Sequence, residues 1–294
     1  MTAQTRSPTP RGRMIEIGAG RALHAIFAGP AATSAPLVVL EAGAFGFSSD
    51  WTAVQEKLAV LGIRSMAYDR AGLGFSAPGP EPRDGLAIAG DLERLLLHVG
   101  EPGPFILCGH SMAGLRVRLF AARNPGRVVG VVLVDATTPE AMDSKVVSGF
   151  VGHFGRASRL AAWGAGAGLL SPLSGTGLAD AIGLPGAAGA EKRWAFADGR
   201  HNHWAAREVE FWSDSARQAR EAGAFDARLP VAVILAGGLN DRSGFRVGQM
   251  APARQSNHGW VETVGGATHA TMLNHEFADA IVRGIEHVRA VRPG

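Results

Sequence analysis

Residues 104–114 read Pro-Phe-Ile-Leu-Cys-Gly-His-Ser-Met-Ala-Gly, and this stretch decides the fold. The apolar run 105–108 predicts a buried strand, and the residues from Gly114 to Asn124 have the pattern of a helix. Between them, the small residues Gly109 and Ala113 flank Ser111 and permit a tight turn. A strand, a sharp turn with a serine at its tip and a helix together predict a nucleophile elbow, with Ser111 as the nucleophile.

The rest of the chain repeats the alternation of short β-rich runs with longer helical patterns. This alternation favours an α/β fold with a largely parallel sheet covered by helices. The predicted strands are residues 14–17, 22–28, 37–41, 63–68, 105–108, 128–134, 231–236 and 260–264. The clearest predicted helices are residues 51–61, 85–99, capped by Asp84, and 274–291.

The alternation breaks between the sixth and seventh predicted strands. Residues 137–228 hold no convincing strand, contain four of the six tryptophans and include a stretch rich in glycine and alanine. We interpret this segment as a helical cap inserted after strand six; an ordinary helical subdomain without a gating role is the alternative. The predicted organisation is a flexible leader over 1–13, a core over 14–136 and 229–294, and the cap.

The composition limits the classes of protein to which this chain can belong. The 294 residues include 46% hydrophobic and only 19% charged side chains, which favours an ordered globular chain. The net charge of +3 is spread along the sequence without a Lys/Arg block, so we expect no nucleic-acid partner. Cys108 is the only cysteine, and no run of about 18 apolar residues suggests a membrane span. We expect a cytoplasmic protein without a membrane partner; its oligomeric state stays open.

A serine hydroxyl attacks only when a base removes its proton and donors receive the oxyanion. His269 follows the last predicted strand and fits the base, ahead of His275 in the terminal helix. The N–H of Met112, at the start of the helix after the elbow, is the first predicted oxyanion donor. The N–H of Ala44, in the loop after the third strand, is the second.

The acid that orients the histidine has two candidates. Asp241 follows strand 231–236, and Asp135 ends strand 128–134. Both would lie at the carboxyl edge of the sheet, where sites in such folds form. We predict Asp241 as the acid and keep Asp135 as the alternative. The chain order is then serine, aspartate, histidine.

Residues 68–76 read Tyr-Asp-Arg-Ala-Gly-Leu-Gly-Phe-Ser, which is similar to a D-R-x-G-x-G-x-S segment. With residues 109–114, Asp241 and His269, the chain resembles capped, esterase-like serine members of the α/β-hydrolase fold superfamily over 14–136 and 229–291. The resemblance implies an eight-stranded sheet whose second strand is antiparallel. The chain departs at residues 41–43, where many members carry His-Gly, and at Ala113, which replaces a glycine. We expect Asp69 and Arg70 to fix the glycine-rich loop after strand four.

The expected chemistry is two-step acyl transfer through an acyl-enzyme on a small, largely apolar carboxylic ester or lactone. Phe45, Phe47 and Phe75 are predicted to contact the substrate. We expect no metal, because the His201–His203 stretch lacks supporting ligands, and no cofactor. Peptidase, carbon–carbon bond hydrolase, cofactor-free haloperoxidase and hydroxynitrile lyase activities stay open, as does a non-enzymatic ligand-binding role.

Overall fold

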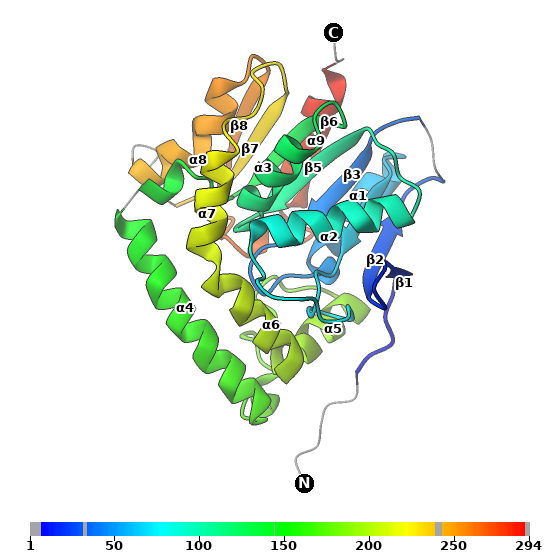
Figure 1. Ribbon diagram of the computed structural model, residues 1–294, viewed down its shortest axis with the longest axis vertical. Helices are drawn as coiled ribbons and strands as arrows, with labels where there is room; N and C mark the ends of the chain where they lie inside the picture. The colour runs from blue at the N-terminus through cyan, green and yellow to red at the C-terminus, as the bar shows by residue number, and fades with distance from the viewer. Residues whose placement is uncertain (1–6, 32–33, 144, 239–242, 292–294) are drawn as a thin grey trace.

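A computed structural model describes residues 7–31, 34–143, 145–238 and 243–291 (Figure 1). Its centre is an eight-stranded sheet in the order β1-β2-β4-β3-β5-β6-β7-β8. Strand β2 pairs antiparallel with β1 and β4, and every other pairing is parallel, as expected. The strands are β1 Arg13–Glu16, β2 Ala22–Ala28, β3 Leu37–Glu41, β4 Ser65–Tyr68, β5 Phe105–His110, β6 Val128–Val134, β7 Val231–Ala236 and β8 Gly259–Val264.

Both faces of the sheet are apolar because helices cover both. In β3, Val38 and Leu40 belong to one buried cluster and Leu37 and Val39 to another. Helices α1 (Thr52–Val60) and α9 (Ala278–Ala290) cover the first face; α2 (Gly85–His98), α3 (Ala113–Arg123) and α8 (Gly244–Gln255) cover the second (Figure 1). Side chains alternate across a strand, so a strand buried on both faces reads as a continuous apolar run.

Most predicted bounds are confirmed. Strands β2, β3, β6 and β7 have the predicted residues, and the Asp84 carboxylate caps α2 by accepting from the Ala87 N–H at 2.9 Å. The terminal helix begins at Ala278, later than predicted. The side-chain oxygen of Asn274 accepts from the N–H groups of Glu276 and Phe277 and makes a turn there instead. Such Asx turns compete with helix formation.

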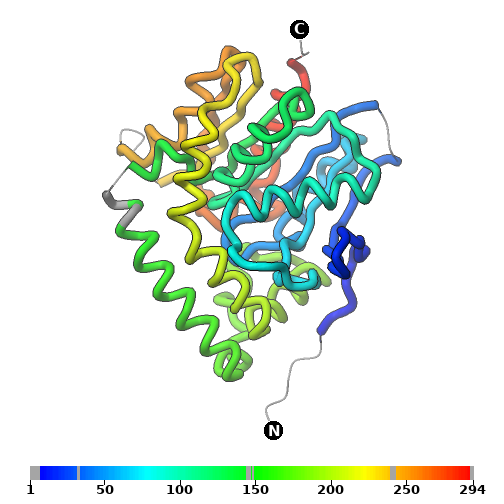
Figure 2. The backbone as a smooth tube through the Cα atoms, viewed as in Figure 1, coloured from blue at the N-terminus to red at the C-terminus, as the bar shows by residue number. Residues whose placement is uncertain are grey.

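The segment between β6 and β7 has helices and no strand in its described residues. It contains η2 Ala141–Asp143, α4 Lys145–Gly166, η3 Ser171–Leu173, α5 Gly186–Ala197, α6 Gly199–Glu210 and α7 Trp212–Glu221. Helices α4 and α6 pack side by side below the sheet in Figure 2, and α5 contacts η1 (Ser48–Trp51) and α6. We call residues 145–210 the cap.

Helix α7 differs from the predicted division of the chain. It packs against α2 and α3, so it adds to the helical layer over the sheet although residues 137–228 were predicted to be cap. Tryptophan Trp212 is buried in the same core cluster as Leu115 and Leu119 of α3. Across the described ranges, every helix is too short or too polar to cross a membrane.

Candidate active site

Ser111 sits in a strained turn between β5 and α3. Its φ of +59° lies in the left-handed region, which costs energy for any residue other than glycine. Three backbone hydrogen bonds hold the turn. The Ser111 N–H donates to Val134, and the Ser111 carbonyl accepts from Gly114 and Thr137 at 3.2 and 2.8 Å. The local sequence therefore folds into the predicted strand–turn–helix.

The space for a side chain at each position of the elbow explains why Ala113 is tolerated. A Cβ on Gly114 would lie 2.4 Å from the Thr137 carbonyl oxygen, and a Cβ on Gly109 would lie 2.7 Å from Val117. Neither position has room for a side chain. Ala113 is fully buried in the core without such a restriction, so the departure from the usual pattern falls where a methyl group fits.

A continuous hydrogen-bonded chain runs from Ser111 through His269 to Asp135. The Nε2 atom of His269 lies 2.9 Å from the Ser111 Oγ, and its Nδ1 lies 2.7 Å from the Asp135 Oδ2. Because an ionised carboxylate only accepts, Nδ1 carries the proton and Nε2 is free to accept from the serine hydroxyl. The His269 side chain is 52% exposed, whereas that of Asp135 is 8% exposed. The arrangement leaves the histidine open to solvent and buries the carboxylate.

Asp135 occupies the place for which Asp241 was predicted. Asp241 lies outside the described residues, and the contact to His269 Nδ1 is made by Asp135, the alternative. Asp135 directly follows β6 and has a φ of +41°, so it also occupies a strained turn. The physical reason is the sheet order, because β6 lies next to β5 and brings the end of its strand beside the elbow.

Two residues that the sequence analysis did not identify contact Asp135. The Arg246 Nη1 donates to its Oδ1 at 2.9 Å, and the Gln249 Nε2 donates to the same oxygen at 3.3 Å. Burial alone would raise the pKa of Asp135. The hydrogen bond and charge of His269, with the charge of Arg246, outweigh burial and hold that pKa below its ordinary value. Both residues lie on α8, and no motif in the sequence marks them.

His110, the residue before the serine, holds the loop that carries His269. Its ring lies 4.6 Å from that of His269, and its Nε2 lies 2.9 Å from the His269 carbonyl oxygen. A carbonyl oxygen only accepts, so Nε2 carries a proton and donates it there. Burial lowers the pKa of His110 to about 3, so the ring is neutral near pH 7. His110 thus acts as a neutral donor beside His269.

The predicted oxyanion donors belong to two segments that are next to Ser111. A Cβ on Gly43 would lie 2.7 Å from the Ser111 Cβ, so the β3–η1 loop, residues 42–47, passes directly against Ser111. Ala44 follows in that loop, and Met112 stands at the N-terminus of α3. Within the described residues, neither the Ala44 N–H nor the Met112 N–H has an acceptor. Both remain available for a bound group.

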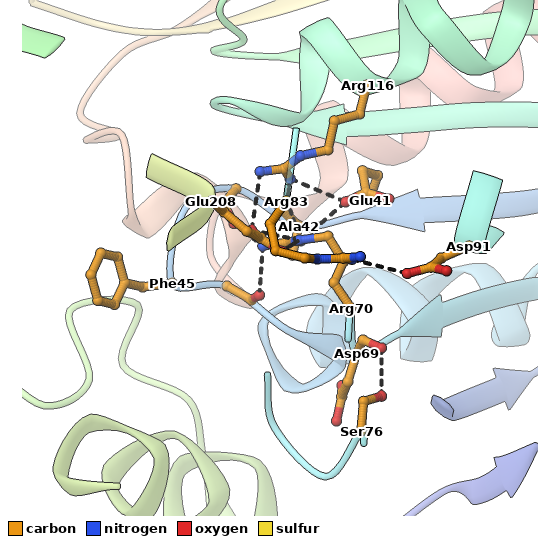
Figure 3. A network of polar contacts seen from close by, with 12 residues as sticks. Glu41, Ala42, Phe45, Asp69, Arg70, Ser76, Arg83, Asp91, Arg116 and Glu208 are labelled. Carbon is orange, nitrogen blue, oxygen red and sulfur yellow. Dashed lines mark hydrogen bonds and ion pairs between the residues drawn. The ribbon is translucent and has the colours of Figure 1, made fainter. Parts of the chain in front are cut away.

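The β3–η1 loop is held by a set of buried charges (Figure 3). Its members are fully or almost fully buried and come from four separate segments: Glu41, Arg70, Arg116 and Glu208. We call these four residues the buried cluster. Arg70 donates to both oxygens of Glu208 at 2.9 Å and to Glu41 at 3.0 Å, while Arg116 reaches the same two carboxylates at 3.4 and 3.2 Å. Burial would raise the pKa of Glu208, but the charges of the two arginines lower it.

Arg70 contacts a different loop from the expected one. The loop after β4 is fixed by Asp69, which accepts from the Phe75 N–H at 2.9 Å. Arg70 instead donates to carbonyl oxygens of the β3–η1 loop, at Ala42 and Gly43, both 2.8 Å away. The prediction for this pair is confirmed for Asp69 and corrected for Arg70.

A cavity of about 320 Å³ lies in the cap, next to the β3–η1 loop. Its wall is mainly apolar and includes Phe45, Phe154, Leu170 and Phe196. The buried Ser158 Oγ also lines it and has no hydrogen-bond partner among the described residues. A buried hydroxyl without a partner is costly, so this atom favours a ligand or water that accepts or donates there. The cavity can take a small apolar group with one polar atom.

Of the three phenylalanines predicted to contact substrate, the structure places only Phe45 on this cavity. Phe47 is fully buried, and Phe75 stacks on Trp194 with ring centroids 5.0 Å apart. These two rings pack the core against the cap, because apolar surface between the layers must be covered. The structure thus describes Phe47 and Phe75 as packing residues, and substrate contact by these two rings stays a prediction.

Comparisons with known proteins agree with this architecture. Residues 36–171 match the family described as alpha/beta hydrolase fold. A Gibberella zeae protein named AB hydrolase superfamily protein is 37% identical over 117 residues, which is 38% of this chain and 36% of that protein. The chain thus matches about a third of the length of that curated relative. With the observed strand order, these matches show that the chain has the α/β-hydrolase fold.

Solved structures with the same fold carry several activities in their names. An esterase from Thermogutta terrifontis is 20% identical, with a TM-score of 0.63 and coverage of 95% of this chain and 100% of its own. The enol-lactonase from Burkholderia xenovorans LB400 is also 20% identical, with a TM-score of 0.66 and coverage of 94% and 100%. The epoxide hydrolase CorEH is 18% identical, with a TM-score of 0.66 and coverage of 96% and 99%. At such identities the likeness concerns the fold alone.

Proposed function

We propose that the protein is a serine hydrolase in which Ser111, His269 and Asp135 form the catalytic triad. The observation that carries this proposal is the continuous chain from Ser111 Oγ to His269 Nε2 and from His269 Nδ1 to Asp135, at 2.9 and 2.7 Å. Both distances are within hydrogen-bond reach, which is the geometric requirement for a nucleophile with its base and orienting acid.

The mechanism follows from the proton positions. His269 takes the hydroxyl proton as the Ser111 oxygen attacks a carbonyl carbon, and the carbonyl oxygen becomes an oxyanion. The N–H groups of Met112 and Ala44 receive that charge. His269 then gives the proton to the leaving group, the acyl-enzyme remains on Ser111, and a water activated by His269 releases the acid. Asp135 stabilises the charged imidazole in both steps.

The substrate we propose is a small, largely apolar carboxylic ester or lactone. The apolar cavity beside Phe45 supports an apolar acyl or alcohol portion, and the unpartnered Ser158 hydroxyl supports one polar atom on it. The names of the esterase and enol-lactonase neighbours agree with this class. The epoxide hydrolase neighbour shares the fold. The elbow of this chain carries a serine, whose hydroxyl beside a base is suited to attack on a carbonyl carbon.

The test is a panel of short-chain aryl esters, lactones and aryl amides assayed with wild type and Ser111→Ala. We expect hydrolysis of an ester or lactone by wild type and a loss of about 10⁶-fold in kcat for the variant, because the nucleophile is removed. Thermal unfolding of both proteins checks that the variant folds. Ester hydrolysis by folded Ser111→Ala at the wild-type rate would refute the nucleophile. Turnover of none of the panel would refute the substrate class.

A further inference from the structure

The cap reaches the β3–η1 loop through a carboxylate. Glu208 lies on α6 of the cap, is 0% exposed and accepts from the Nε of Arg70 with both oxygens at 2.9 Å. The other two nitrogens of Arg70 donate to the carbonyl oxygens of Ala42, Gly43 and Gly46, at 2.8, 2.8 and 3.3 Å. One guanidinium therefore joins the cap to three carbonyls around Ala44.

Charge balance makes Glu208 necessary for this arrangement. The buried cluster has two arginines and two carboxylates, and Glu41 also accepts a hydrogen bond from the Tyr68 hydroxyl. Without the Glu208 charge, the cluster would bury one positive charge in excess. An uncompensated buried charge is strongly unfavourable, so the arginines would shift toward water or toward Glu41. Either movement changes the hydrogen bonds to the loop.

A second link from the cap reaches the residue after Ala44. The Phe45 carbonyl oxygen accepts from His201 Nε2 at 3.2 Å and from Lys192 Nζ at 3.5 Å. The Nδ1 of His201 accepts from the Gly74 N–H at 3.0 Å, and burial lowers the pKa of His201 to about 3. A neutral ring in this tautomer donates to the Phe45 carbonyl. Lys192 of α5 and His201 of α6 therefore both hold the carbonyl of the residue that follows Ala44.

We propose that Glu208 is a positioning residue for the oxyanion hole. Through Arg70 it fixes the backbone of residues 42–46, and thereby aims the Ala44 N–H at the place where the oxyanion forms on the carbonyl attacked by Ser111. The proposal rests on the proposed function. It makes the cap part of the catalytic geometry as well as a wall of the cavity, and it requires α6 to stay on the core during turnover.

The experiment compares Glu208→Gln with Glu210→Gln. Both residues lie on α6, but Glu210 is exposed and pairs with Arg207. Each variant is assayed for kcat and KM on the aryl ester that wild type hydrolyses. It is also assayed for inhibition by an aryl boronic acid, whose tetrahedral serine adduct imitates the oxyanion. Substrate affinity is measured separately in the Ser111→Ala background by calorimetry.

For Glu208→Gln we expect kcat to fall by about tenfold to a hundredfold, since a misplaced donor loses part of the stabilisation that one oxyanion contact gives. Boronate affinity should fall in parallel, while substrate affinity in the Ser111→Ala background stays within about twofold, because these contacts act on the transition state. Glu210→Gln should match wild type in every reading. A purely structural role would lower the melting temperature and leave kcat and boronate affinity unchanged.

Unchanged kcat and boronate affinity in folded Glu208→Gln would overturn the proposal. If that variant does not fold, Glu208→Asp takes its place with the same readings, since it keeps the charge and withdraws it by one methylene. Labelling of wild type by a fluorophosphonate distinguishes a failure of the proposed function from a failure of the positioning role. An unlabelled Ser111 refutes the proposed function, whereas a labelled Ser111 with unchanged Glu208 variants refutes only the positioning role.

Discussion

Among the described residues, two carboxylate–cation clusters hold the surroundings of Ser111, and they differ in their access to water. The open cluster, Asp135 with His269, Arg246 and Gln249, includes a histidine that is 52% exposed. In the buried cluster, the side chains of Arg70 and Glu208 are each only 1% exposed. Proton transfer needs a group that can change its charge, and fixed geometry needs groups that cannot. The difference fits our proposal that the open cluster performs the chemistry and the buried cluster holds the backbone.

Replacing Asp135 breaks the open cluster with the largest expected effect. In Asp135→Asn, the amide can donate to His269 Nδ1 and favour the tautomer that has no lone pair for Ser111. We expect kcat to fall about 10⁴-fold, as for other triads, with KM changed little. Steady-state kinetics on the best ester checks this. The control is Asp226→Asn, which removes the carboxylate of an exposed ion pair with Arg228.

The same assay on Asp241→Asn decides between the two acids considered from the sequence. Because Asp135 already occupies His269 Nδ1, the Asp241 carboxylate is not needed there, and its variant should keep kcat within about threefold of wild type. A larger loss in Asp241→Asn than in Asp135→Asn would reverse the assignment.

Truncating Glu208 breaks the buried cluster and should affect stability more than any exposed pair. Glu208→Ala leaves buried arginine charge uncompensated, so we expect the free energy of unfolding to fall by about 3–5 kcal/mol. Urea denaturation followed by tryptophan fluorescence measures it. Glu221→Gln removes an exposed partner of Arg217 and should leave the midpoint unchanged. Equal stabilities of the two variants would contradict the contrast between the clusters.

Acid should weaken both clusters in the same direction. The pKa values of Asp135 and Glu208 are lowered in the folded protein, so the unfolded chain binds more protons as the pH falls. Their stabilisation is fully present above the ordinary carboxyl pKa of about 4 and is lost as the pH falls through the lowered values. Glu208→Gln should therefore lose less stability than wild type between about pH 5 and pH 2. Parallel stability curves for the two proteins would argue against a lowered pKa at Glu208.

A small effect is expected at Ala113 of the elbow. Ala113→Gly restores the usual pattern in a place where a methyl group already fits, so kcat should stay within about threefold and stability should fall by about 0.5–1 kcal/mol. Gly114→Ala is the contrasting variant, since its Cβ would meet the Thr137 carbonyl at 2.4 Å. A strong loss of activity in Ala113→Gly, measured by the same kinetics, would show that the methyl group shapes the elbow.

The sequence predicts the strands, Ser111 and His269 better than it predicts the residues that hold them in place. Continuous apolar runs mark β3, β6 and β7 because these strands are buried on both faces. The elbow pattern and the loop after the last strand lead to Ser111 and His269, which the structure brings within 2.9 Å. The acid was ambiguous, because Asp135 and Asp241 both follow strands that end at the same edge.

The buried cluster lies beyond what sequence patterns can predict. Arg70 and Glu208 are 138 residues apart, and their pairing depends on how α6 packs on the core. A charged residue in an amphipathic helix such as α6 normally indicates a solvated face, so nothing local distinguishes Glu208 from the exposed Glu210. The glycine-rich segment at residues 68–76 suggested a local role for Arg70, but only the fold shows that its guanidinium turns to the loop of Ala44.

The central claim is that the open cluster activates Ser111. Treating the protein with a fluorophosphonate and locating the adduct by peptide mass spectrometry tests it most directly. We expect one stoichiometric adduct on Ser111, formed in wild type and about 10³-fold or more slowly in Asp135→Asn, because the loss of the orienting acid weakens the base. An adduct on another serine, or labelling of Ser111 at the wild-type rate in Asp135→Asn, would contradict the account.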